Sequence, residues 1–184
     1  MSTNINYIWK DYMDLSTDEL YAIINLRQEV FVYEQNCPYI DADYSDQDAF
    51  HLLGYKENDL VAYLRAFKPK IKYEGSSIGR IVVKKDFRNL NLGKDITNLG
   101  KSFLFEKFPN HEIVISAQYR LEKFYENLGF TSRGDVYLED DIDHIQMFFY
   151  LTNDTFIKQQ ITYFLCYKRS KRVHKMQDFI EKRP

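Results

Sequence analysis

The segment from Ile81 to Lys94, IVVKKDFRNLNLGK, constrains the fold of this chain more than any other. A short apolar run leads through a polar turn into residues with helical periodicity, which indicates a buried strand followed by a helix. The first N–H groups of a helix lack intrahelical partners and carry partial positive charge. Gly93 lets a ligand approach the backbone closely. The segment therefore predicts either a pyrophosphate site or an ordinary strand-to-helix turn.

Hydrophobic periodicity divides the rest of the chain into strands and interspersed helices, which predicts the mixed α/β class. Ser16 and Glu19 have the spacing of a capping box and begin a helix that extends to Phe31. Arg27 lies on the apolar face of that helix, so it needs an acidic partner if it is buried. We expect strands at residues 5–12, 50–55, 59–67, 78–83, 112–116, 131–139 and 142–151, and further helices at 91–108 and 120–128.

Length and composition limit the classes of function. A chain of 184 residues, 45% of them apolar, fits one domain with a short appendage. The net charge of −2 gives no sign of a nucleic-acid partner. No apolar run approaches the roughly 20 residues that span a bilayer, and neither Cys37 nor Cys166 has metal or redox spacing. We therefore expect a cytoplasmic protein with no membrane span, no metal site and no bound nucleic acid.

Residues 151–184 differ in charge from the rest of the chain. They hold eight Lys or Arg and three acidic residues, a net charge of +5, which leaves −7 for residues 1–150. An apolar stripe at helical spacing, which includes Phe156, Ile161 and Phe164, predicts a basic amphipathic helix. The stripe packs on the body or on a second subunit of a homodimer, or it binds an acidic partner or a membrane surface.

The strand–turn–helix segment resembles the coenzyme A signature of the GNAT N-acetyltransferases, which is Q/R-x-x-G-x-G/A after a strand. Arg88 matches the first position of the signature and Gly93 the last, while Asn91 stands in place of the middle glycine. Asparagine is the non-glycine residue that best tolerates a left-handed backbone, so the turn can be retained.

Other segments resemble the ElaA-like branch of the same family, in the same order, over residues 9–148. Asp141 and Asp143 depart from its pattern, which has Gly and Pro at these positions, and the tail after Leu151 lies outside the resemblance. The matching segments are residues 26–39, Asp41-x-Asp43 with His51, 78–83, 116–118, 124–130 and 137–147.

This resemblance implies a GNAT acyl-CoA N-acyltransferase fold, with a central, mostly antiparallel sheet of splayed strands and flanking helices. It implies a GNAT domain at residues 1–151, with the C-terminal basic helical extension at 152–184 added to it. It implies acetyl-CoA as the cosubstrate, with its pantetheine arm paired to strand backbone and its pyrophosphate held by loop amides, and Gln118 matches a contact to the arm. The implied cofactor-binding residues are Ile81, Val82, Val83, Arg88, Asn89, Leu90, Asn91, Leu92, Gly93, Lys94 and Gln118.

Tyr125 matches the position of the GNAT general acid. A tyrosine of ordinary pKa, about 10, keeps its proton at neutral pH and can give it to a departing thiolate. The alternative is a packing role in the core.

The general base is less defined, because Ile113 occupies the strand position at which some members of the family carry a glutamate. Glu34 and His51 join Tyr125 as the predicted catalytic residues, and His144 is a further candidate. A neutral imidazole can accept a proton at pH 7. A structural hydrogen bond for each histidine, or a water chain in place of a base, are the alternatives.

The resemblance implies an enzyme that transfers an acetyl group from acetyl-CoA to a primary amine of a small molecule or a peptide by direct attack. An acyltransferase of homoserine-lactone-synthase type and a non-catalytic coenzyme A-binding or interaction module are the alternatives. The acidic loop with Asp41, Asp43, Asp46 and Asp48 either attracts a cationic amine or is a solvated loop.

Overall fold

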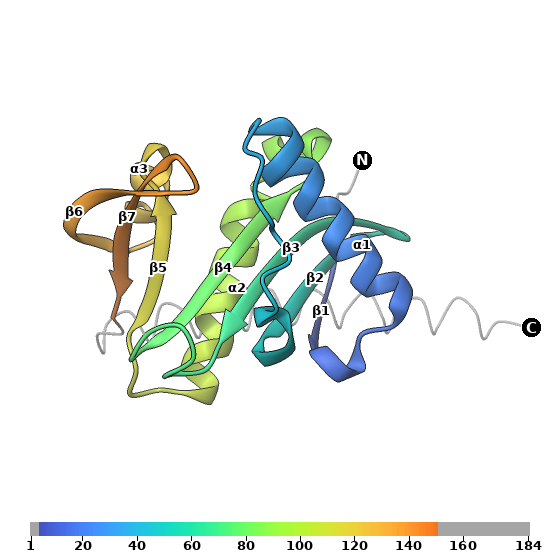
Figure 1. Cartoon of the computed structure of the whole chain (residues 1–184). Coiled ribbons are helices and arrows are strands. Elements are labelled where there is room, and N and C mark those ends of the chain that lie inside the picture. The colour runs from blue at the N-terminus through green and yellow to red at the C-terminus, as the bar shows by residue number, and fades with distance from the viewer. Residues whose placement is uncertain (1–3, 151–184) are drawn as a thin grey trace, which may run out of the picture. The chain divides into compact units, whose positions relative to one another are not determined.

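The computed structural model describes residues 4–150, so the helix expected at 152–184 lies outside the described residues. Within residues 4–150, seven strands form one sheet in the order β1-β2-β3-β4-β5-β7-β6 (Figure 1). No helix in this part of the chain is long and apolar enough to cross a bilayer. The strands are β1 Asn6–Asp11, β2 Phe50–Lys56, β3 Asp59–Phe67, β4 Ser76–Val83, β5 Ile113–Gln118, β6 Thr131–Glu139 and β7 Ile142–Phe149.

Two long helices lie on opposite faces of the sheet, and a short one follows β5 (Figure 1). Ser16 Oγ accepts a hydrogen bond from Glu19 N and Glu19 Oε2 accepts one from Ser16 N, so the predicted capping box is confirmed. The regular helix ends earlier than predicted and continues as a π-helical turn, Gln28–Glu34. The helices are α1 Thr17–Arg27, α2 Leu92–Lys107 and α3 Glu122–Glu126.

Strands β1 to β4 pair antiparallel and form the N-terminal arm of the sheet. Every residue of β3 after Asp59 is buried, because α1 covers one face and α2 the other. The buried side chains of α1, such as Ile23 and Leu26, pack against Leu53 and Tyr63. This arm therefore contains a closely packed two-sided core.

Strands β5, β7 and β6, together with α3, form the C-terminal arm. Both β5 and β6 pair antiparallel with β7. Gly129, at φ +89°, follows α3 and ends it as the sequence predicted. None of the residues of β6 is buried, so this arm has far less core than the other.

Strand pairing between the two arms is short. Strands β4 and β5 run parallel and pair at Ser76 with Ile113 and at Ser77 with Val114, and then they diverge (Figure 1). The mixed α/β class and the mostly antiparallel sheet with splayed strands are therefore confirmed.

A β-bulge interrupts β4 on the wall of this opening. Tyr63 pairs with Val82 and Arg65 pairs with Gly79, so β4 has one residue more than β3 between the two pairs. Arg80 takes up the extra length with a φ of 49°, a left-handed conformation that is uncommon for residues other than glycine. A bulge leaves backbone groups out of the ladder, and here they lie beside the opening.

A buried ion network holds the bulge in place. Arg27 donates hydrogen bonds to Asp41 and to Asp46, both at 2.7 Å, so the acidic partner predicted for this arginine is confirmed. Arg80 Nε donates to the other oxygen of Asp41 at 2.7 Å, which connects the bulge to α1. The network consists of Arg27, Arg65, Arg80, Asp41, Asp43 and Asp46.

The acidic loop is therefore largely neutralised inside the protein. Burial opposes ionisation of Asp43, but the hydrogen bonds and charge of Arg65 outweigh it and hold the pKa of Asp43 well below its usual range. Burial likewise opposes ionisation of Asp46, and Arg27 and Arg65 lower its pKa. For Asp41, Asp43 and Asp46, neither expectation holds, whereas Asp48 is exposed, as expected of a residue in a solvated loop.

Candidate functional site

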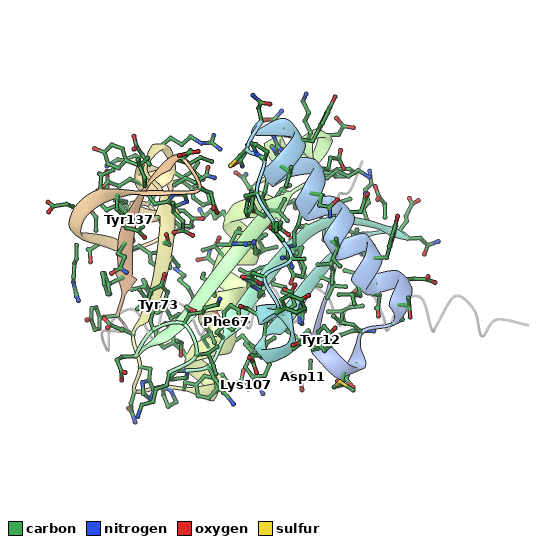
Figure 2. All side chains as sticks on the ribbon, in the orientation of Figure 1. Asp11, Tyr12, Phe67, Tyr73, Lys107 and Tyr137 are labelled. Carbon is green, nitrogen blue, oxygen red and sulfur yellow. The ribbon has the colours of Figure 1, made fainter. Side chains whose placement is uncertain are left out.

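The diverging strands enclose a cleft of about 1050 Å³. This is at the upper end of the roughly 300–1,000 Å³ typical of ligand pockets. Residues 77–83 of β4 form one wall, and Ser116 and Gln118 of β5 form part of the other. Phe67 and Tyr73, labelled in Figure 2, lie at the end near the β3–β4 connection. The predicted strand residues Ile81, Val82 and Val83 therefore line the cleft.

The predicted phosphate-binding turn follows Arg88 and leads into α2. Asn91 has φ 60° and ψ 14°, so the prediction that this residue supplies a left-handed backbone is confirmed. Its carbonyl accepts the hydrogen bond from Asp95 N at 3.1 Å, and its side chain does not cap the helix. Helix geometry therefore leaves the N–H groups of Leu92, Gly93 and Lys94 without intrahelical acceptors.

Gly93 does not use the left-handed region of the backbone, and its predicted role, which is to let a phosphate approach the backbone closely, stays a prediction. A Cβ at this position would lie 3.7 Å from Phe124 Cζ, which is ordinary van der Waals contact. The residue thus marks where α3 approaches the start of α2. Asn89 and Leu90 belong to the 3₁₀ turn Lys85–Leu90 just before it.

Arg88 and Glu34 both line the cleft and pair with each other. Arg88 Nη2 lies 2.7 Å from Glu34 Oε2, and Arg88 Nε donates to the carbonyl of Val83 at 3.1 Å. The carboxylate that was predicted as a base is therefore engaged by the arginine that was predicted to bind phosphate.

Gln118 connects the two arms across the cleft. Its Nε2 donates to Gln35 Oε1 at 2.7 Å, and its Oε1 accepts from Arg120. Cys37 Sγ also lies 3.2 Å from the carbonyl of Asp140 in the β6–β7 turn. Gln118 lies on the cleft wall as expected, but its amide is already bonded to the segment that follows α1.

Tyr125 lines the cleft from α3 and is only 8% exposed. Its ring packs edge-on against Phe124 and Phe130, and Leu128 N donates to its backbone carbonyl at 2.9 Å. Its hydroxyl makes no hydrogen bond within residues 4–150. Burial raises the pKa of Tyr125 to about 12, so the phenol is protonated at neutral pH.

His51 is fully buried on β2 and does not reach the cleft. Its Nε2 lies 2.9 Å from the carbonyl of Asp46, which can only accept, so its Nδ1 accepts from Tyr63 OH at 2.7 Å. Burial lowers the pKa of His51 and keeps the ring neutral. Both nitrogens are occupied, so the ring is a structural element beside the ion network.

A hydrogen-bonded chain on the C-terminal arm was not predicted from the sequence. Ser116 Oγ donates to Glu139 at 2.6 Å and accepts from Tyr137 OH at 2.6 Å. The predicted strand at 112–116 ended before the alternation was complete: in β5, Ser116 and Gln118 are only half-buried and alternate with the buried Ile115 and Ala117.

A family comparison agrees with this geometry. The model of the acetyltransferase (GNAT) domain family matches residues 14–151. The chain belongs to the GNAT family. Membership supports an acyltransferase that uses an acyl-CoA and an acceptor substrate. A UPF0039 protein from Synechocystis sp. is 40% identical over 147 residues, which are 79% of this chain and 95% of that protein.

The ElaA-like resemblance is also confirmed. Protein ElaA of Escherichia coli is 38% identical over 143 residues, 76% of this chain and 94% of that protein. The crystal structure of an acyl-CoA N-acyltransferase from Pseudomonas aeruginosa has a TM-score of 0.75 at 37% identity and covers 79% of this chain and 99% of its own.

Proposed function

We propose that this protein transfers an acetyl group from acetyl-CoA to a primary amine of a small molecule or a peptide. The observation that carries the proposal is the cleft between β4 and β5, which has an uncapped helix N-terminus next to it and a protonated tyrosine in its wall.

The N-terminal arm supplies the groups that bind the donor. Beyond Ser77, β4 has no strand partner on its β5 side within the described residues, so its backbone groups can pair with the amides of a pantetheine arm. The free amides at the start of α2 and the positive end of that helix suit a pyrophosphate. The bulge at Arg80 offers backbone N–H groups that can polarise a thioester carbonyl.

Tyr125 acts mainly as a hydrogen-bond donor. Its pKa of about 12 lies well above the ordinary thiol value of about 8.5, so complete proton transfer to a thiolate is uphill by about 5 kcal/mol. A hydrogen bond from the phenol to the departing sulfur requires no such transfer, and it stabilises the charge that develops there. The proton of the thiol product then comes from the amine or from solvent.

The test is release of free thiol from acetyl-CoA by full-length protein with a panel of primary amines. We expect amine-dependent release, and we expect Tyr125→Phe to lower kcat by about 10²-fold with unchanged affinity for acetyl-CoA. Tyr119→Phe, at an exposed tyrosine outside the cleft lining, is the matched control and should have no effect.

Two outcomes would contradict the proposal. Binding of acetyl-CoA without transfer to any amine would favour a non-catalytic binding module. Transfer only from acyl-carrier protein would favour an acyltransferase of homoserine-lactone-synthase type.

A further inference from the structure

We propose that His144 is the catalytic base that removes the proton from the acceptor amine. This role rests on the acyltransferase function proposed above and supplies the one group that the reaction there does not assign.

His144 lies within the cleft wall of the C-terminal arm. On β7 it pairs with Gln118 of β5 on one side and with Tyr137 of β6 on the other. It lines the cleft and is 9% exposed. The ring is therefore largely withdrawn from bulk water but still open to a ligand in the cleft.

The hydrogen bonding of the ring defines which nitrogen is basic. Nδ1 lies 2.8 Å from the carbonyl oxygen of Ile142. A carbonyl can only accept, so Nδ1 carries a proton in the neutral ring as well as in the charged one. Nε2 has no hydrogen-bond partner within residues 4–150. In the neutral ring this nitrogen holds the free lone pair, which is the requirement for a general base.

A chain of hydroxyl groups brings negative charge to the same wall. The ring of Tyr137 stacks near His144, with centroids 6.3 Å apart and an interplanar angle of 29°. Tyr137 OH donates to Ser116 Oγ, which donates to Glu139 Oε2. Glu139 lines the cleft too. A carboxylate in the cleft wall attracts the ammonium group of an amine acceptor.

Charged and titratable groups come from several elements on this side of the cleft. The ring of Tyr137 on β6 contacts His144, and the cleft lining also includes Glu139 of β6, Asp140 of the β6–β7 turn, Arg120 after β5 and Tyr125 of α3. Asp143 is adjacent to His144 in β7, and neighbouring strand residues point to opposite faces of the sheet.

The other two candidate bases, His51 and Glu34, are both bonded to other groups. Both ring nitrogens of His51 are bonded to other groups and lie outside the cleft. The carboxylate of Glu34 is paired with Arg88 at 2.7 Å. Only His144 of these three combines a place in the cleft wall with a nitrogen that is unpaired within residues 4–150.

The reaction balances with this assignment. One proton of the ammonium moves to Nε2 of His144, and the freed nitrogen forms a C–N bond with the thioester carbonyl carbon. The C–S bond then breaks, and a second proton from the same nitrogen ends on the sulfur of coenzyme A. The imidazolium releases its proton to water, so the products are an amide, a thiol and one proton.

The test compares His144→Gln with wild-type full-length protein, using acetyl-CoA and two kinds of amine. Alkylamines are protonated at neutral pH, whereas hydroxylamine is mostly unprotonated. We expect kcat/KM for an alkylamine to fall by about 10²-fold or more. We expect a smaller loss with hydroxylamine, a flattened acid limb of the pH profile, and unchanged affinity for acetyl-CoA. His111→Gln, at an exposed histidine outside the cleft lining, is the matched control.

Two further measurements separate a catalytic role from a structural one. Tyr137→Phe and Ser116→Ala keep Nε2 of His144 but remove the chain of hydroxyl groups. We therefore expect a smaller loss of kcat/KM than in His144→Gln, with the acid limb of the pH profile retained. If His144→Gln does not fold, the ring resonances of wild-type His144 are followed by NMR during titration with an alkylamine in the presence of coenzyme A, which carries no acetyl group to transfer. A shift of the Nε2 signal is expected, and its absence would overturn the assignment.

Failure of this inference differs from failure of the proposed function. Wild-type protein that acetylates amines, with His144→Gln as active as His111→Gln, refutes the base alone. Equal losses for alkylamine and hydroxylamine with an unchanged pH profile also refute it. Wild-type protein that acetylates no amine refutes both.

Discussion

Strand β3 of the N-terminal arm is buried from Leu60 to Phe67, whereas β6 of the C-terminal arm has no buried residue. Beside the N-terminal arm, three arginines and three aspartates are paired in one network, whereas the polar chain of Ser116, Tyr137 and Glu139 on the C-terminal arm joins two hydroxyl groups to one carboxylate. The two walls of one cleft therefore differ in burial and in how their charges are paired.

The contrast indicates a division of roles. In the proposed reaction, the donor thioester requires backbone amides in fixed positions, and we expect the bulge held by Arg80 and Asp41 to provide that rigidity. The acceptor must be recognised by side chains, and an exposed arm can change these side chains at little cost to the core. We therefore expect changes in the N-terminal arm to affect stability and changes in the C-terminal arm to affect acceptor use.

Removing Arg27 should produce the largest effect. Arg27→Met leaves Asp41 and Asp46 as buried charges that have lost a partner, so we expect a loss of about 3–5 kcal/mol in the free energy of unfolding, measured in urea. Arg133→Met on β6 is the matched control, since Arg133 is half exposed, and should cost less than about 0.5 kcal/mol. Similar losses in both variants would invalidate the contrast between the arms.

Lys101 of α2 forms a buried hydrogen bond to the C-terminal arm, and its substitution measures what that contact contributes to stability. It is 2% exposed, and its Nζ donates to the carbonyl of Leu128 at 2.6 Å. Burial lowers its pKa to about 8 from 10.5, so between these pH values the unfolded chain binds a proton that the folded protein does not. Below pH 8, the folded protein bears the full cost of burying the charged ammonium group. The free energy of unfolding should therefore rise by about 3 kcal/mol between pH 8 and pH 10.5, as the group loses its proton.

Lys101→Met should abolish this contribution to the rise, as measured by urea unfolding at several pH values from 7 to 10.5. If the free energy of unfolding rises equally with pH in the variant and the wild type, the ammonium group of Lys101 does not cause the rise.

Asn91 tests the backbone of the proposed donor site at the start of α2. A β-branched residue tolerates the left-handed backbone poorly, so Asn91→Val should cost about 1–2 kcal/mol and weaken acetyl-CoA binding by about tenfold in calorimetry. Asn91→Gly relieves this strain and should bind at least as tightly as wild type. Weak binding by both variants would indicate that the asparagine side chain itself contacts the ligand.

The smallest effect is expected on the surface of β6. Val136→Thr places a hydroxyl in solvent and should change stability by less than about 0.5 kcal/mol. The same substitution at Val61 in β3, which is fully buried, should cost about 2 kcal/mol. The unfolding midpoints of the two variants give the comparison directly, and equal midpoints would contradict it.

Local signals in the sequence predicted much of the fold. The capping box at Ser16, the left-handed Asn91 and the glycine after α3 each depend on a few neighbouring residues. The need of Arg27 for an acidic partner followed from its place on an apolar face. These inferences hold because the underlying physical constraint is local.

Features that depend on contacts between distant segments were not predicted. The π-helical turn Gln28–Glu34 has the same apolar spacing as a regular helix, and the bulge at Arg80 is set by its pairing with β3. The burial of His51 depends on Asp46 and Tyr63, and the engagement of Gln118 depends on Gln35, 83 residues away. The cleft therefore matched its predicted backbone better than its predicted side chains.

Calorimetric titration of full-length protein with acetyl-CoA tests the central claim most directly. The account predicts saturable binding at one site with micromolar affinity, which corresponds to about −8 kcal/mol. Absence of binding at high ligand concentration, confirmed at two temperatures, would contradict a donor site between β4 and β5.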